Sequence, residues 1–241
     1  STVKSAVSMY YRCSSLEVAG ELNEGLTDAS FMYSASGVVK MDNPLPSTLK
    51  NIDSMFYCCK LKEIDWKIFD NVTIDSAKNT FAGCNKLVSI KGEINHIKDG
   101  TGLLSSCGFT VMPKFATDNI LEIADRMFGT GTGEYKKLES YGGNTLPNSV
   151  KSMKYCFANT DITEVLPVPS GITDKNAFKG CYRNCTKLTD VSNMIDFISS
   201  HTDTNDNSCF TDSLAITTPA TAKELNEQYS GWSFNHVTVP Y

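Results

Sequence analysis

The chain has 241 residues and a formal net charge of −5, with lysine and arginine scattered along it. This charge balance argues against a nucleic-acid-binding surface, and no apolar run approaches the roughly 18–20 residues that a membrane span needs. Hydrophobic residues make up 41% of the chain and aromatic residues 10%. That content can bury a large core, and no linker interrupts it, so we expect one elongated domain.

The first residues begin inside a repeated phrase, which is best seen at residues 81–90. In this phrase, two residues separate an aromatic residue from a cysteine. One or two residues then separate the cysteine from an aliphatic residue, and two more separate that residue from a second aliphatic residue. The copies, about nine and irregular, begin at Tyr10, Met32, Phe56, Phe81, Leu104, Phe128, Phe157, Tyr182 and near Phe210. Their mean spacing is 25 residues, within the roughly 20–29 of leucine-rich repeats. We expect a solenoid, because one copy cannot bury its own apolar face.

Each copy is also expected to contain a short helix and a short strand. Residues 49–56 and 150–153 carry apolar residues three or four apart and predict helix starts, each after a proline phrase that ends the preceding segment. Residues 61–66 alternate apolar and polar side chains and predict a strand. One coil is therefore predicted to be helix, turn, short strand and loop.

The cysteines are interpreted as part of this repeat. This alignment assigns Cys13, Cys59, Cys84, Cys107, Cys181 and Cys185 to the cysteine slot, with Ala35 filling it in the copy at Met32. A free thiol behaves as a small hydrophobe, so we expect a buried thiol ladder. Disulfides between stacked coils remain an alternative in an oxidising compartment. A zinc site is not expected, since the chain has no pair of cysteines separated by two residues.

The two ends differ. The chain opens inside a repeat at residues 3–9, so we expect another segment or subunit to cover that end of the core. Residues 218–229 predict a helix that Gly231 ends, and residues 232–239 alternate as a last strand. The division expected is a repeat region over 1–217 and a C-terminal cap over 218–241.

The phrase at residues 81–90, together with the upstream proline phrase, resembles the BspA-like leucine-rich repeats. The looser form that begins Met55-Phe56 and Met127-Phe128 is similar to related surface-protein repeats of bacteria and of phages of gut bacteria. The resemblance implies an α/β fold: a right-handed solenoid with short parallel strands on one face and short helices on the other. It also implies a recognition or adhesion module, outside the cell or on the surface of a bacterium.

A candidate binding face follows from the expected strands, whose side chains alternate between the core and solvent. The outward positions are Lys40, Asp42, Glu63, Asp65, Lys67, Ser89, Lys91, Ser140, Glu164 and Asp190, with Val18 and Ser192 at its margins. This face is polar and mixed in charge, which suits a protein or glycan partner, and the alternative is a merely solvated face. Insertions at residues 129–137 and 201–208 offer a second surface.

No enzyme, cofactor or metal is predicted. The three histidines lie in different parts of the chain, and none stands beside a serine or cysteine in a known nucleophile motif. Residues 203–214 begin like a calcium loop but carry leucine where the loop requires glutamate. The alternative function is a phage virion component, a tail-fibre or receptor-binding part, which the Gly231-Trp232 ending favours and which would be an oligomer, often a trimer.

Overall fold

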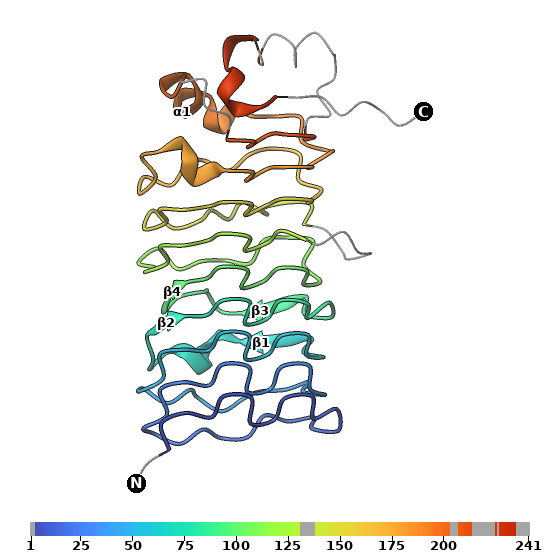
Figure 1. Cartoon of the computed structure of the whole chain (residues 1–241), viewed down its shortest axis with the longest axis vertical. Coiled ribbons are helices and arrows are strands. Elements are labelled where there is room, and N and C mark those ends of the chain that lie inside the picture. Colours follow the sequence, from blue (N-terminus) through green and yellow to red (C-terminus); the bar gives the residue numbers. More distant parts are fainter. Residues whose placement is uncertain (1–2, 131–137, 203–206, 214–224, 226, 235–241) are drawn as a thin grey trace.

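The computed structural model describes residues 3–130, 138–202, 207–213, 225 and 227–234. The chain winds into coils that follow one another along the long axis of the molecule (Figure 1). Backbone hydrogen bonds join each coil to the next, for example from Ala29 N to Asn51 O and from Ile52 N to Ser76 O, both at 2.9 Å. Residues roughly 25 positions apart in the sequence therefore lie side by side.

Most of the backbone is irregular, and the regular elements are short. Two parallel sheets of two strands each pair β1 with β3 and β2 with β4. The bounds of the strands are Glu63–Asp65 for β1, Ile74–Ser76 for β2, Ser89–Lys91 for β3 and Ile97–Asp99 for β4. The helices that lie entirely within the described residues are α1 (Ile195–Ser200) and the 3-10 turns η1 (Trp66–Phe69), η2 (Lys175–Phe178), η3 (Ser192–Met194) and η4 (Ser230–Trp232).

Parallel pairing continues beyond the named strands as single bridges. One column runs through β2 and β4 and joins equivalent positions of seven coils: Ser5, Asp28, Asn51, Ser76, Asp99, Ile123 and Ser152. A second set contains β1 and β3 and the separate bridges Val18–Lys40, Val111–Ser140 and Glu164–Asp190. In each coil the two sets lie on either side of a five-residue piece, such as residues 54–58. We call this piece the turn segment.

The turn segment replaces the predicted helix. In residues 54–58, Ser54 and Cys58 have positive φ values of 55°, a conformation that a right-handed helix cannot contain. Alternate residues donate their N–H groups to the next coil, and Phe56 N reaches Thr80 O at 2.9 Å. The helix starts predicted at 49–56 and 150–153 are therefore wrong, although Ile52 and its apolar neighbours do point into the core. Their spacing arises from the corners of a coil.

The middle residues of the turn segments form a column of rings, which is 37% exposed at Tyr10 and buried from Tyr33 onward. Tyr10, Tyr33, Phe56 and Phe81 stack with centroids 5.4–5.6 Å apart and ring planes within 9°. Leu104 follows in the same hydrogen-bonded position, and a second stack then joins Phe128, Phe157, Tyr182 and Phe210. The ring of the second coil is thus Tyr33, not Met32. Ser36, rather than Ala35, stands in its cysteine slot.

The cysteine slot holds a side chain that is small and that also donates a hydrogen bond. The Cys84 thiol donates to Phe56 O at 3.1 Å, and Cys59, Cys107 and Cys185 make the same contact with the ring residue of the preceding coil. Ser213 donates in the same way to Tyr182 O. A buried carbonyl oxygen has two lone pairs, and the backbone N–H of the turn satisfies only one of them. The slot side chain therefore supplies the second bond.

Cys181 is an exception to the predicted assignment. It directly precedes a ring residue, as Cys156 and Cys209 do, and so lies outside the slot. None of the nine cysteines is joined to another by a disulfide, and seven of them are buried. Cys13, which was predicted to belong to the buried thiol ladder, is exposed, as is Cys58. Burial raises the pKa of the Cys84 and Cys181 thiols well above its ordinary value. These groups remain protonated and act as packed, neutral side chains.

Aromatic side chains cover the C-terminal end of the ring column. Phe234 stacks on Phe210 at 4.7 Å, and Trp232 packs against Phe178, Phe197 and Phe210. Of the predicted helix at 218–229, residues 225, 227 and 228 are helical, and most of the remainder lies outside the described residues. The predicted strand at 232–239 is wrong at its start, where Trp232 ends η4, and residues 235–239 are not described.

Candidate functional site

The ten residues predicted as a binding face are called the strand face below. Eight of them lie in β1, β3 or the bridges aligned with these strands, whereas Asp42 follows the bridged Lys40 by two residues and Lys67 lies in η1. Glu63 lies beside Ser89, and Asp65 lies beside Lys91. Lys40 is bridged to Val18 and Glu164 to Asp190. Nine of the ten are exposed and Ser89 is half-buried. The structure therefore brings these residues to the surface in neighbouring pairs.

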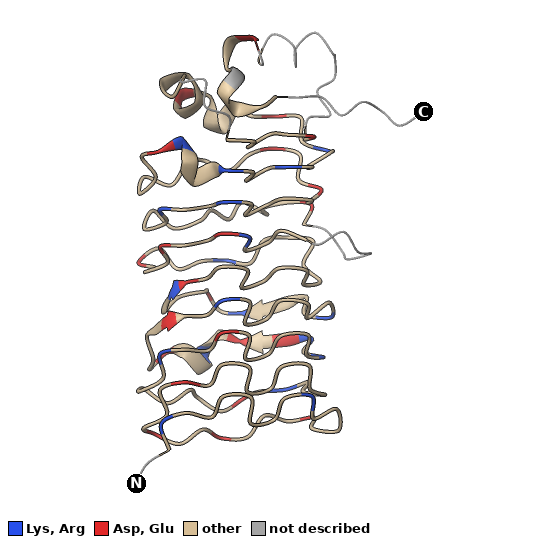
Figure 2. Cartoon of the chain, in the orientation of Figure 1, with Lys and Arg blue, Asp and Glu red and all other residues tan. Residues whose placement is uncertain are grey.

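Charges on the strand face compensate one another. Lys91 Nζ lies 2.7 Å from Glu63 Oε1, and Lys40 Nζ lies 2.6 Å from Asp42 Oδ2. The hydrogen bond and charge of Glu63 raise the pKa of Lys91. Acidic and basic residues are interspersed over the coils and do not gather in separate regions (Figure 2).

Other strand-face carboxylates hold local turns. The side chain of Asp65 accepts a hydrogen bond from Lys67 N and caps η1. Asp190 accepts one from Ser192 N at 2.8 Å, and this backbone hydrogen bond lowers the pKa of Asp190. The strand face therefore offers a ligand few charges that lack a partner within the protein.

The turn segments form a different surface, a groove of about 1000 Å³ that we call the turn-face groove. It crosses seven successive turn segments, a distance of about 30 Å at the spacing of hydrogen-bonded strands. Its lining residues are Tyr57, Cys58, Asn79, Ala82, Gly83, Ser105, Ser106, Arg126, Gly129, Thr130, Tyr155, Ala158, Asn159, Arg183, Asn184 and Asp212.

A run of small side chains creates the groove. The residue directly after the ring residue is Ala82, Ser105, Gly129 and Ala158 in four successive coils. The same position carries the large side chains of Tyr57 before this run and Arg183 after it. The floor is low where the side chain is small, so the two large residues bound the depression.

Side chains at the positive-φ positions lean toward the next coil, and glycine makes room for three of them: Cys58 at Gly83, Asn79 at Gly102 and Tyr155 at Gly180. A Cβ atom on Gly102 would lie 2.2 Å from Asn79 Oδ1, and one on Gly180 would lie 2.3 Å from Tyr155 Cε1. Gly102 and Gly180 themselves have φ values of 64° and 60°, where an L side chain is also disfavoured. Both reasons favour glycine at Gly102 and Gly180, which begin two of the turn segments that form the groove.

Two arginines give the groove a positive character. The Arg126 guanidinium lies over the Tyr155 ring at 4.8 Å from its centroid. With Gly180 beneath the ring, Tyr155 serves as a platform that orients Arg126. Arg183 stands two coils further on. Within the described residues neither guanidinium forms an ion pair, and the only acid in the lining is Asp212.

A ladder of amide groups orders one side of the groove. Asn184 Nδ2 donates to Asn159 Oδ1 at 2.7 Å, and Asn159 Nδ2 donates to Thr130 O at 2.9 Å. The Thr130 hydroxyl donates in turn to Asn159 O at 3.0 Å. These bonds fix polar side chains from three successive coils before any ligand arrives, which reduces the entropy lost on binding.

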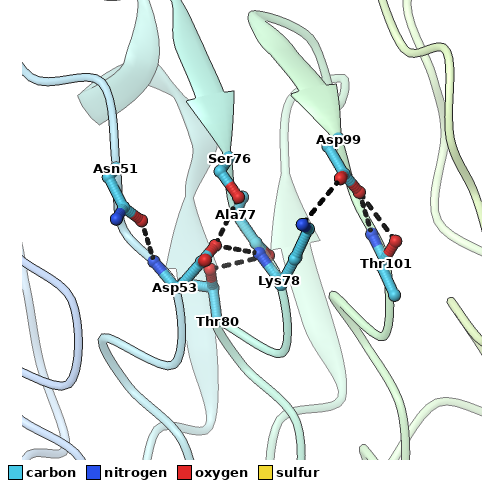
Figure 3. A network of polar contacts seen from close by, with 8 residues as sticks. All are labelled: Asn51, Asp53, Ser76, Ala77, Lys78, Thr80, Asp99 and Thr101. Atoms are coloured by element: carbon cyan, nitrogen blue, oxygen red, sulfur yellow. Dashed lines mark hydrogen bonds and ion pairs between the residues drawn. The ribbon is translucent and has the colours of Figure 1, made fainter.

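Carboxylates beside the turn segments form hydrogen bonds that join one coil to the next (Figure 3). Asp53 Oδ1 accepts hydrogen bonds from Ser76 Oγ and Lys78 N, both at 2.7 Å, and Lys78 Nζ lies 3.4 Å from Asp99 Oδ2. Asp125 repeats the first arrangement with Ser152 and Lys154. These acids bind backbone and hydroxyl groups of the next coil and so maintain the alignment of the groove floor.

Sequence reasoning missed the turn-face groove. The helix starts predicted at 49–56 and 150–153 end just before lining residues such as Tyr57 and Tyr155, which fall in the predicted turn, and the outward positions of that turn were not compared from coil to coil. The available signal was the run of small residues after successive ring residues. Of the two inserted loops proposed as a second surface, residues 131–137 and 203–206 lie outside the described residues.

The described part of the chain contains no group of three or more histidine, cysteine or acidic residues placed to hold a metal ion. None of its helices is both long enough and apolar enough to cross a membrane. Comparisons of the chain with models of known families, with curated proteins and with solved structures gave no match.

Proposed function

We propose that this chain is a leucine-rich-repeat solenoid of the BspA-like kind and that it acts as a non-enzymatic recognition module. The observation that supports the binding role is the turn-face groove, which has a volume of about 1000 Å³ and is built from equivalent positions of seven coils. A long, open groove with side chains held in place suits an extended ligand. The coil-by-coil repetition lets contacts of the same kind recur along its length.

The chemistry of the groove supports binding rather than catalysis. Acid–base and nucleophilic reactions need a nucleophile and a base within hydrogen-bond reach of each other. The described lining residues bring together arginine, asparagine, serine, threonine and tyrosine, with one aspartate and the Cys58 thiol. The set is rich in hydrogen-bond donors and acceptors and holds no histidine.

The proposed location is outside the cell or on the surface of a bacterium, which rests on the resemblance to BspA-like repeats. In that setting the partner is a protein or a glycan of a host or neighbouring cell. The virion alternative would require an oligomer, and light scattering of the isolated chain separates the two. A monomer is expected for the surface module, and a stable trimer would favour the tail-fibre interpretation.

Glycan and protein arrays probed with the folded chain test the proposed function. The expected result is saturable binding to one class of ligand that disappears when the same chain is heat-unfolded before it is applied. Absence of saturable binding to both arrays would contradict a recognition role and leave the solenoid as a spacer.

A further inference from the structure

We propose that the turn-face groove binds an acidic polysaccharide, with Arg126 and Arg183 holding its carboxylates. This inference rests on the proposed recognition function and specifies both the surface and the chemical class of the ligand. It places the ligand on the turn segments rather than on the strand face that the sequence predicted.

Charge complementarity is the first argument. The whole chain carries a net charge of −5, yet the described lining of the groove contains two arginines and one aspartate. The guanidinium group binds carboxylates through two parallel hydrogen bonds, so arginine suits this ligand better than lysine would. The two arginines stand two coils apart, about 10 Å along the stack at the spacing of hydrogen-bonded strands. Acidic groups that recur along a polymer can reach both.

The second argument separates a glycan from a peptide. The alternate N–H groups of the turn segments are donated to the next coil, as from Phe128 N to Cys156 O at 2.9 Å. The groove therefore has no free strand edge on which a peptide could pair. Its floor of alanine, glycine and serine also lacks the deep apolar pocket that peptide anchors fill.

Polar side chains supply the remaining contacts. The amides of Asn159 and Asn184 are held in a ladder, and an amide can donate and accept at the same time. Ser105 and Thr130 bring hydroxyl groups to the same floor. Groups of this kind, present in four successive coils, match a chain whose units each carry several hydroxyls.

The experiment measures binding of the full chain to polygalacturonate, alginate, hyaluronate and polysialic acid, each paired with its carboxyl-esterified form. We expect at least one acid polymer to bind and its ester to bind at least tenfold more weakly. Arg126→Gln and Arg183→Gln should each weaken binding about tenfold, which corresponds to about 1.4 kcal/mol, because each variant loses charge-assisted hydrogen bonds to a carboxylate.

Arg12→Gln is the matched control. Arg12 also lies over a tyrosine ring, that of Tyr11 at 5.1 Å, but outside the groove, so this variant should bind like the unaltered chain. Equal binding of acid and ester, equal binding by all three variants, or failure to bind any acid polymer would overturn the inference. Binding to a protein or a neutral glycan on the arrays, unaffected by Arg126→Gln and Arg183→Gln, would overturn it while leaving the proposed function standing.

Discussion

The strand face and the turn face are built by the same coils, yet they differ in how their charged side chains are paired. On the strand face Lys91 pairs with Glu63 and Lys40 with Asp42. On the turn face, acids such as Asp53 and Asp125 bind backbone groups of the next coil, and Arg126 and Arg183 are left facing a groove. The comparison teaches that a mixed-charge surface is not by itself a binding surface, because its charges can satisfy one another.

The largest effect is expected where the floor of the groove meets the core. Phe157 is fully buried and stacks on Phe128 and Tyr182, so Phe157→Ala should lower the free energy of unfolding by about 3–5 kcal/mol. Phe157→Leu should cost much less, because Leu104 occupies the equivalent position of another coil. Denaturant titration measures both.

Phe31→Ala is the control for this prediction, since Phe31 begins a turn segment and is 44% exposed. Its substitution should change stability little. If Phe157→Ala were no more costly than Phe31→Ala, the ring column would not support the turn face.

A second prediction concerns the glycine beneath Tyr155. Gly180→Ala introduces a Cβ atom 2.3 Å from the ring at a φ of 60°, so it should destabilise the fold by more than about 1 kcal/mol. Because it displaces the platform of Arg126, it should also weaken ligand binding. Gly20→Ala, where the space around the new Cβ is open and φ is not positive, should leave both unchanged. A Gly180→Ala variant with the same melting midpoint as Gly20→Ala would refute the assigned geometry.

The cysteine slot gives a smaller effect. Threonine and valine have nearly the same shape, but only threonine can donate to the Phe56 carbonyl that Cys84 now serves. Cys84→Thr should therefore be more stable than Cys84→Val by about 1 kcal/mol. Thermal unfolding of the two variants side by side measures the difference. A more stable Cys84→Val would mean that the slot requires only a small apolar group.

The smallest effect is expected on the strand face. Because Glu63 raises the pKa of Lys91, this pair stabilises the folded state below the ordinary pKa of lysine, and that contribution is lost as pH rises through the folded-state value. Both side chains are solvent-exposed, so Glu63→Gln should hardly move the melting midpoint at pH 7. Melting curves at low and high salt check this, and a large loss at low salt would show that the strand face contributes more than expected.

The sequence predicted the ring column better than the surfaces built on it. Phe81 and Tyr182 could be placed because a large apolar residue recurs beside a small slot residue. The second coil was misaligned because Met32 and Tyr33 are both large and apolar, and only the stacking with Tyr10 distinguishes them. The predicted helices failed because apolar spacing is the same for a helix turn and for a coil corner.

The groove could not be derived from the sequence for a related reason. A small residue such as Ala158 is unremarkable alone, and it forms part of a floor only when Gly129 of the preceding coil and Arg183 of the following coil are aligned with it. That alignment depends on insertions of variable length between the coils. The backbone hydrogen bonds show which residues are aligned, whereas the amino-acid sequence alone does not.

The most direct test of the account adds a large side chain to the turn-face groove in one variant and to the strand face in another. Ala158 occupies the position at which Tyr57 stands in another coil, so Ala158→Tyr should fold normally and block the turn-face groove. Ser140→Tyr adds the same bulk to the strand face. Titration of each folded variant with the acid polymer that binds the unaltered chain should show binding abolished by Ala158→Tyr and kept by Ser140→Tyr, and the reverse pattern would contradict the account.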